Sequence, residues 1–270
     1  MSKVIHGAWR TPVNIGAGAA GTIHDDAEAQ CHGFAGGTVA GSIHMEQYWG
    51  LLSKVFGPDW IAHGGLSLWF MQPTISGEPV RCSAVRDGDD ADADVWMENR
   101  AGDRISEGTA DFGRAPGNPR PTEFTRRRAA LRPSTTPNLL DGVAVGHRAT
   151  GIPAYWSASD VATRRAIVTE DLPGYAERPP VLPTDLAINL MRLVEPQLVT
   201  VPPGVIGLYG AIELRTFGQP VRADTDYTLS GEVLAIGQTP RSETFWYRSD
   251  AHHQGRPAAQ MLHMARLLCE

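Results

Sequence analysis

The sequence predicts an α+β fold made of two similar modules, in each of which an antiparallel sheet wraps around one central helix. The first half of the chain holds an apolar helical stretch followed by a series of strand-like segments, and the second half repeats this order of elements. Repetition over about 120 residues is typical of a duplicated module. Two such sheets can each bury an apolar helix and pair with each other edge to edge.

The central helix of the first module is predicted over residues 42–56. Ser42 is a good N-cap residue, and Gly57-Pro58 is a typical helix end. Gly41, in front of the cap, would let a ligand come close to the first free amides of the helix. Apolar side chains recur along the helix at helical spacing, at Tyr48, Leu51, Leu52 and Val55.

An antiparallel meander follows this helix. Leu66, Leu68 and Phe70 alternate with Ser67 and Trp69, which is the pattern of a strand. Ala101-Gly102-Asp103 is a typical hairpin turn. Further strands are predicted at residues 80–85, 95–99 and 105–112, and an opening strand at residues 8–13.

The segment 116–140 is predicted to link a first module at residues 1–115 to a second module at residues 141–270. It is rich in proline and charge and has no apolar period, which is typical of a linker. Its arginine triplet, Arg126-Arg127-Arg128, could meet a ligand phosphate, but a solvated linker is the simpler interpretation.

The second module is predicted from the same order of elements. A strand at residues 212–216 leads to Gln219-Pro220, just as the corresponding strand of the first module leads to Gln72-Pro73. The helix that follows Pro183-Thr184 carries apolar residues at helical spacing, namely Leu186, Leu190, Leu193 and Val194. Two further strands are predicted at residues 245–247 and 261–268, on either side of a turn at Gly255.

Composition excludes several classes of function. The chain has 270 residues and a formal net charge of −6, which argues against a general nucleic-acid binder because such a protein needs a basic face. Cys31, Cys82 and Cys269 are widely spaced and odd in number, so neither a disulfide framework nor a zinc site is indicated. No segment approaches the roughly 20 apolar residues that cross a bilayer, and the N-terminus lacks the core of a signal peptide. We therefore expect a cytoplasmic protein that binds neither membrane nor nucleic acid.

The candidate chemistry lies before and at the start of the first helix. His24 stands beside Asp25 and Asp26, and an imidazole with a neighbouring carboxylate can transfer protons near neutral pH. We expect His24 to carry the proton, with Asp25 or Asp26 orienting it or activating water. The amides around Gly41 and Ser42 would stabilise a carbonyl oxygen that gains negative charge. No metal ligands are indicated, because His24, Asp25 and Asp26 are contiguous, and no cofactor is expected.

Two residues inside the helix have alternative interpretations. His44 lies in the first turn, where it would contact a ligand or be a satisfied histidine of the core. Glu46 could activate water for thioester hydrolysis. The second module has neither a His-Asp pair nor glycines in its loop at residues 178–185. We therefore expect a degenerate second module that completes the sheet and walls the pocket.

These residues resemble the MaoC-like hydratases and dehydratases, a family with the double hotdog fold. The family signature places a His and an Asp close together, then an Ala, then Gly-Phe, then a glycine-rich turn into the central helix. The matching residues here are His24 to Asp26, Ala29, Gly33-Phe34 and Val39 to Gly41. The resemblance implies two hotdog modules and a lyase that hydrates or dehydrates an acyl thioester such as an acyl-CoA.

The chain also departs from the family motif Asp-x-Asn-Pro-x-His. Ala19 stands five positions before His24, where the family has its catalytic Asp, and Gly21 stands in place of the Asn. Two alternatives therefore remain open beside the lyase: a hotdog acyl-CoA thioesterase using Glu46, and a non-catalytic protein that binds an acyl ligand. The partner is in each case a small molecule, and a homodimer is left open.

Overall fold

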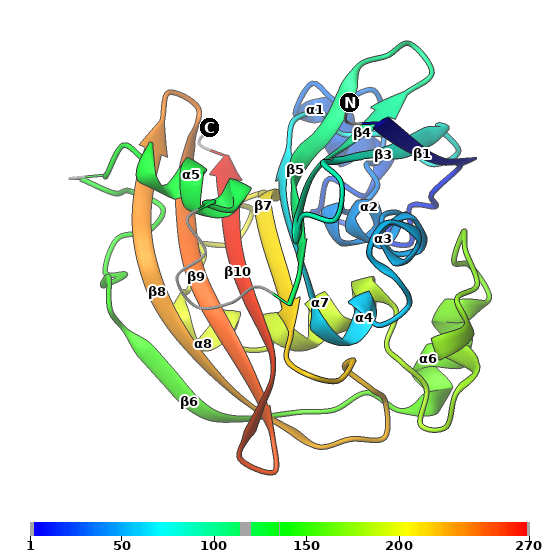
Figure 1. Ribbon diagram of the computed structural model, residues 1–270. Helices are drawn as coiled ribbons and strands as arrows, with labels where there is room; N and C mark the ends of the chain where they lie inside the picture. The colour runs from blue at the N-terminus through cyan, green and yellow to red at the C-terminus, as the bar shows by residue number, and fades with distance from the viewer. Residues whose placement is uncertain (1–2, 114–119, 135, 269–270) are drawn as a thin grey trace.

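The computed structural model describes residues 3–113, 120–134 and 136–268 (Figure 1). Cys269 and residues 116–119 and 135 of the expected linker lie outside them. Ten strands form one antiparallel sheet in the order β1-β3-β4-β5-β2-β7-β10-β9-β8-β6. The first five strands are β1 (Lys3–Arg10), β2 (Gly64–Phe70), β3 (Val80–Arg86), β4 (Asp92–Asn99) and β5 (Arg104–Phe112). The last five are β6 (Arg148–Ala154), β7 (Gly207–Thr216), β8 (Tyr227–Thr239), β9 (Ser242–His253) and β10 (Arg256–Leu268).

The strand order of one half is the reverse of the other half. In each half the first strand lies at the outer edge, and the second strand lies at the seam where the halves meet. At this seam β2 and β7 pair from Gly65 opposite Arg215 to Trp69 opposite Ala211. The expected edge-to-edge pairing is thus present, but it joins the two expected sheets into one continuous sheet. In Figure 1 the C-terminal half of this sheet is at the left and the N-terminal half is at the right.

The helix predicted over residues 42–56 is two helices, α2 (Gly41–Glu46) and α3 (Trp49–Phe56). The Gln47 side chain donates to the Ile43 carbonyl at 2.9 Å, which is the acceptor that the Gln47 amide would use in a continuous α-helix. The backbone amide of Gln47 instead donates to the carbonyl of His44, one residue nearer in the chain, at 3.1 Å. The chain therefore tightens between the two helices. The predicted end at Gly57 is correct, because Gly57 has φ 98° and caps α3.

The remaining helices lie before and after these elements. They are α1 (Asp26–Cys31), α4 (Trp60–His63), α5 (Glu123–Ala129), α6 (Ala158–Arg165), the 3₁₀ helix η1 (Pro173–Ala176), α7 (Thr184–Arg192) and α8 (Glu195–Leu198). The helix predicted after Pro183-Thr184 is α7, and it packs against α2. None of the helices in the described ranges has the length and apolar character of a membrane span.

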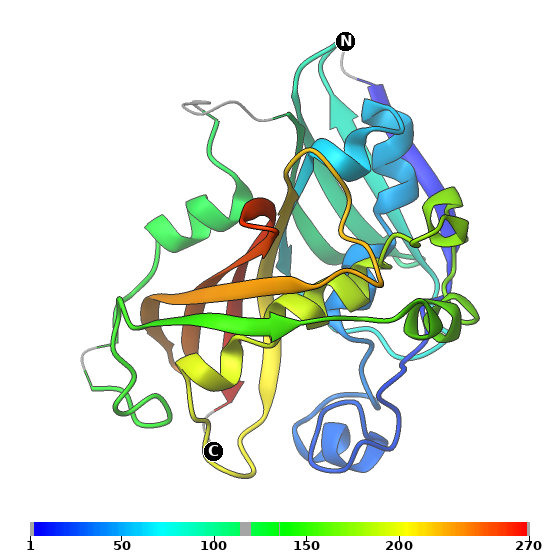
Figure 2. The same cartoon turned by 90° about the horizontal axis from the view of Figure 1, so that it is seen from below.

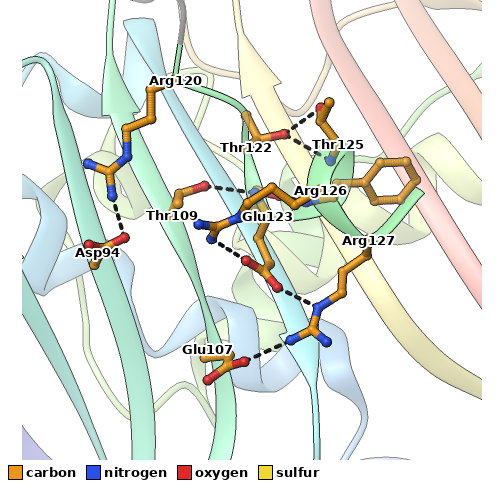
Figure 3. Close-up of polar contacts among 11 residues, drawn as sticks. Asp94, Glu107, Thr109, Arg120, Thr122, Glu123, Thr125, Arg126 and Arg127 are labelled. Atoms are coloured by element: carbon orange, nitrogen blue, oxygen red, sulfur yellow. Dashed lines mark hydrogen bonds and ion pairs between the residues drawn. The ribbon is translucent and has the colours of Figure 1, made fainter. Parts of the chain in front are cut away.

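Helix α5 lies in the segment that we expected to be a plain linker (Figure 3). The Thr122 side chain caps its first turn, and Phe124 is buried against Trp246 with ring centroids 5.0 Å apart. Glu123 is also buried and accepts hydrogen bonds from Arg126 and Arg127. Arg126 is exposed and Arg127 is partly exposed, which fits the expected solvated segment, but both also pair with a buried carboxylate of the same helix.

Candidate active site

The segment between β1 and α2, which includes α1, projects beyond the sheet and is drawn in blue in Figure 2. His24 lies in this segment, just before α1. Asn14 holds this loop from inside: its side-chain amide donates to the His24 carbonyl at 2.8 Å, and its oxygen accepts from the Gly16 amide at 3.1 Å. Gly37 packs so close that a Cβ there would lie 2.3 Å from the His24 carbonyl oxygen. The glycine-rich stretch is therefore required for this packing, which fixes the backbone of His24.

The His24 imidazole has one committed nitrogen. Its Nδ1 lies 2.7 Å from the carbonyl oxygen of Thr38. A carbonyl can only accept, so Nδ1 carries the hydrogen, and in the neutral ring Nε2 keeps a free lone pair. The ring is half-buried and lines a cavity. His24 can therefore take up and release a proton at Nε2.

The two carboxylates beside His24 are bonded elsewhere. Asp25 is the N-cap of α1 and accepts from the amides of Ala27 at 3.0 Å and Glu28 at 3.1 Å. Asp26 accepts from the Gly37 amide at 2.7 Å. The expected orienting role is thus corrected, because a backbone carbonyl orients the imidazole while Asp25 and Asp26 hold the surrounding loop.

The cavity beside His24 has a volume of about 190 Å³ and lies at the seam between the halves. The β2–β7 ladder ends at Trp69 and Ala211, and beyond this pair the two strands are no longer paired with each other. Arg192 of α7 donates to the hydroxyl of Tyr209 at 2.8 Å and so holds one wall. The side chains and backbone that line this cavity include His24, Gly41, His44, Phe70, Tyr209 and Arg266.

Gly41 is the first residue of α2 and lines this cavity. A Cβ at Gly41 would lie 2.8 Å from Cβ of Tyr209, so glycine is what lets the helix approach β7. The first amides of a helix have no acceptor within the helix. In α2 the amides of Ile43 and His44 already bond to the Ala40 carbonyl, so the amide of Gly41, at the cavity, is the donor that we consider for a ligand. The N-cap is Ala40 and not Ser42 as predicted. Ser42 is buried and donates to Asp185 of α7 at 2.6 Å.

His44 is both a core residue and a cavity residue. It is 2% exposed, and its Nε2 lies 2.8 Å from the Thr74 hydroxyl. Burial lowers the pKa of His44 to about 4, so the ring is neutral near pH 7. The two interpretations of this residue are therefore compatible.

Glu46 is buried away from the cavity lining. Its Oε1 lies 2.9 Å from the Arg164 guanidinium, which also lies 3.4 Å from Asp185. Burial raises the pKa of Glu46 to about 7, and the charge of Arg164 offsets only part of this effect. Glu46 thus lies in an ion cluster between the central helices, and not where it would activate water for a substrate at His24.

Sequence reasoning missed the contribution of the second half. Tyr209 and Arg266 lie on β7 and β10, and only the pairing at the seam brings them to His24. Arg164 and Asp185 were also missed, because they face α2 from α6 and α7.

Other reactive side chains and hollows of the described residues lie apart from this site. Cys31 is exposed, and His32 pairs with Glu28 on α1. A larger and more open hollow of about 920 Å³ lies between α6 and residues 171–180, and shares no lining residue with the His24 cavity. Within the described part of the chain, no group of three or more His, Cys, Asp or Glu side chains could hold a metal ion.

No protein-family model matches the sequence, and no curated protein matches it. Solved structures are similar over the whole chain. A protein assigned as a MaoC domain dehydratase from Chloroflexus aurantiacus has a TM-score of 0.65 at 13% identity, covering 100% of this chain and 96% of its own. A conserved hypothetical protein from Mycobacterium tuberculosis with a double hotdog fold has a TM-score of 0.62 at 12% identity, covering 99% and 96%. A MaoC-like dehydratase has a TM-score of 0.58 at 13% identity, covering 98% of each chain.

The likeness establishes the fold. The chain has the double hotdog fold that MaoC-like dehydratase structures share, as the resemblance of the residues from His24 to Gly41 implied.

Proposed function

We propose that the protein is a hydratase or dehydratase acting on an acyl thioester or a related carbonyl compound, with His24 as its acid and base. One observation carries this proposal: the imidazole with a free Nε2 lines the same cavity as the amino end of α2. A proton carrier and a set of backbone donors on one cavity are what an enolate-forming reaction requires.

In the dehydration direction, Nε2 of His24 removes a proton from the carbon next to the thioester carbonyl. The amides at Gly41 stabilise the oxygen that becomes negative. The C–O bond at the next carbon then breaks, and the leaving hydroxyl receives the proton from Nε2 and departs as water. Hydration is the reverse of these steps.

The sequence departure at Ala19 fits a mechanism with a single acid-base group. Ala19 lies in an exposed turn, where its carbonyl accepts from the Thr22 hydroxyl at 2.8 Å. Asp25 and Asp26 are engaged in the loop. We therefore assign both the removal and the return of the proton to His24, and a supporting role to the two aspartates.

The test is His24→Ala, assayed on a panel of enoyl-CoA thioesters by loss of the conjugated thioester absorbance. We expect turnover to fall by about 10² to 10⁴, the contribution of general acid-base catalysis. His32→Ala is the matched control, because His32 is an exposed histidine at the C-cap of α1, where its Nε2 lies 3.1 Å from Glu28. Circular dichroism should show native folding in both variants.

Other outcomes would favour the alternatives. Unchanged turnover in His24→Ala would remove His24 from the mechanism. Release of free thiol by the wild type, without hydration, would indicate a thioesterase. Binding of acyl-CoA without any turnover would indicate a non-catalytic acyl-binding protein.

A further inference from the structure

Arg266 brings a positive charge to the cavity from the second half of the chain. It lies on β10 just after a register shift between Met264 and Ala265, and it lines the same cavity as His24. Its guanidinium lies over the indole of Trp69, 4.7 Å from the ring centroid. Gly210 leaves room for Met264 and Arg266, because a Cβ there would lie 2.3 Å from Cε of Met264 and 3.0 Å from Nε of Arg266.

The guanidinium has no acidic partner within residues 3–113, 120–134 and 136–268, and its one charged neighbour there is Arg127. The burial of Arg266 and, to a smaller extent, the charge of Arg127 lower the pKa of Arg266. Arg127 lies over the same indole at 4.5 Å, but it pairs with Glu123 and Glu107. None of the five N–H donors of this half-buried guanidinium is used in a hydrogen bond to the described residues, and none of its nitrogens is fully buried, so they are open to a ligand. Arg266 is therefore ready to bind an anion that enters the cavity.

The size of the cavity indicates which part of a ligand can carry that anion. A cavity of about 150 Å³ holds a benzene molecule, so one of about 190 Å³ holds roughly six to eight heavy atoms. His24 and Arg266 both line this space. A short acyl unit therefore has room to reach Arg266 while its reacting carbon lies at His24.

We propose that Arg266 binds a carboxylate on the acyl group, so that the site selects short acyl thioesters that carry a second, ionised carboxyl group. This inference rests on the proposed function. The planar guanidinium can hold both oxygens of a carboxylate, and Trp69 fixes its orientation before the ligand arrives.

The experiment compares two enoyl-CoA thioesters of matched length, one ending in a methyl group and one in a carboxylate, on the wild type, Arg266→Gln and Arg127→Gln. We expect Arg266→Gln to lower kcat/KM for the carboxylate substrate by about 10- to 100-fold, mainly through KM, since charged hydrogen bonds are lost. The methyl substrate should change by less than about threefold. Arg127→Gln is the matched control, because it removes the other cation that lies over the Trp69 indole. This variant should preserve the preference for the carboxylate substrate.

An equal loss on both thioesters would overturn the inference, because it would place Arg266 against the phosphates of the carrier or in a structural role. Titration calorimetry also measures the binding of both thioesters to the wild type, Arg266→Gln and Arg127→Gln. If nothing is turned over, the proposed function fails, yet a carboxylate preference lost only in Arg266→Gln would still support the anion site. Equal binding of both thioesters by the wild type would refute it.

Discussion

Replacing Glu46 by Gln tests whether a buried carboxyl between the two halves controls the pH dependence of stability. Glu46 is 7% exposed and lies against Arg164, which is 5% exposed. Its second oxygen, Oε2, is buried without a hydrogen-bond partner. The ionised form of Glu46 is therefore only partly compensated, which is why burial outweighs the effect of Arg164 and raises the pKa.

The magnitude follows from that pKa. The carboxyl has an ordinary value of 4.5 and a folded-state value of about 7, a difference that corresponds to about 3 kcal/mol. Because the folded-state pKa is the higher one, this contribution to stability is fully present below pH 4.5 and is lost as the pH rises through 7. About 2.5 kcal/mol of the loss falls between pH 5 and pH 8.

Urea denaturation of the wild type and Glu46→Gln at pH 5 and pH 8 measures this contribution. The buried histidines His44 and His263 have lowered pKa values, so they destabilise the fold in the opposite direction, as the pH falls. They titrate in both proteins, so the difference between the two proteins isolates Glu46. We expect that difference in unfolding free energy to change by about 2.5 kcal/mol in favour of the variant at high pH. A difference constant within about 0.5 kcal/mol would refute the reasoning.

Two further variants test the packing around the cavity. Ser42→Ala removes the donor to buried Asp185 and should lower the free energy of unfolding by about 1.5 to 3 kcal/mol in urea titrations; no loss would mean that this contact is not formed in solution. Gly41→Ala should push α2 away from Tyr209 and lower the free energy of unfolding by about 1 to 3 kcal/mol. It should also abolish most of the turnover. Gly207→Ala is its control on the same cavity, because its Cβ would lie 3.8 Å from Leu267; equal effects would argue against the close approach at Gly41.

Local patterns in the sequence predicted most elements because their causes are local. The end of α3 at Gly57 and the alternation in β2 depend on residues within a few positions of each other. The role of Ser42 could not be predicted in this way. A serine before an apolar helix is a reasonable N-cap, but Asp185, 143 positions away, takes its hydrogen bond. Helix α5 was missed because it is short and its buried face consists of Glu123 and Phe124.

The residues of the candidate site likewise separate into those with local causes and those brought together by long-range pairing. His24 was identified from the sequence because Asp25 and Asp26 stand beside it, and Gly41 because it precedes the apolar helix, and both patterns involve residues that are close together in the chain. The group that orients His24 was not, since the Thr38 carbonyl is a backbone atom that no side-chain pattern reveals. Tyr209 and Arg266 come from the other half, and the sequence alone does not give the register of β2 on β7.

The two ends of the β2–β7 ladder explain why one cavity, and not two, is the candidate for chemistry. At the end opposite His24, the Arg215 guanidinium lies against Gly65 and pairs with both oxygens of Asp111 at 2.6 Å. The Trp60 indole packs on Gly64, and the space left beside it measures about 10 Å³, enough for one water molecule at most. The duplicated scaffold thus offers two equivalent ends, and large side chains fill one of them. At the other end the seam is open, and His24 from the first half and Arg266 from the second line one cavity, so this is the end to which we assign the proposed reaction.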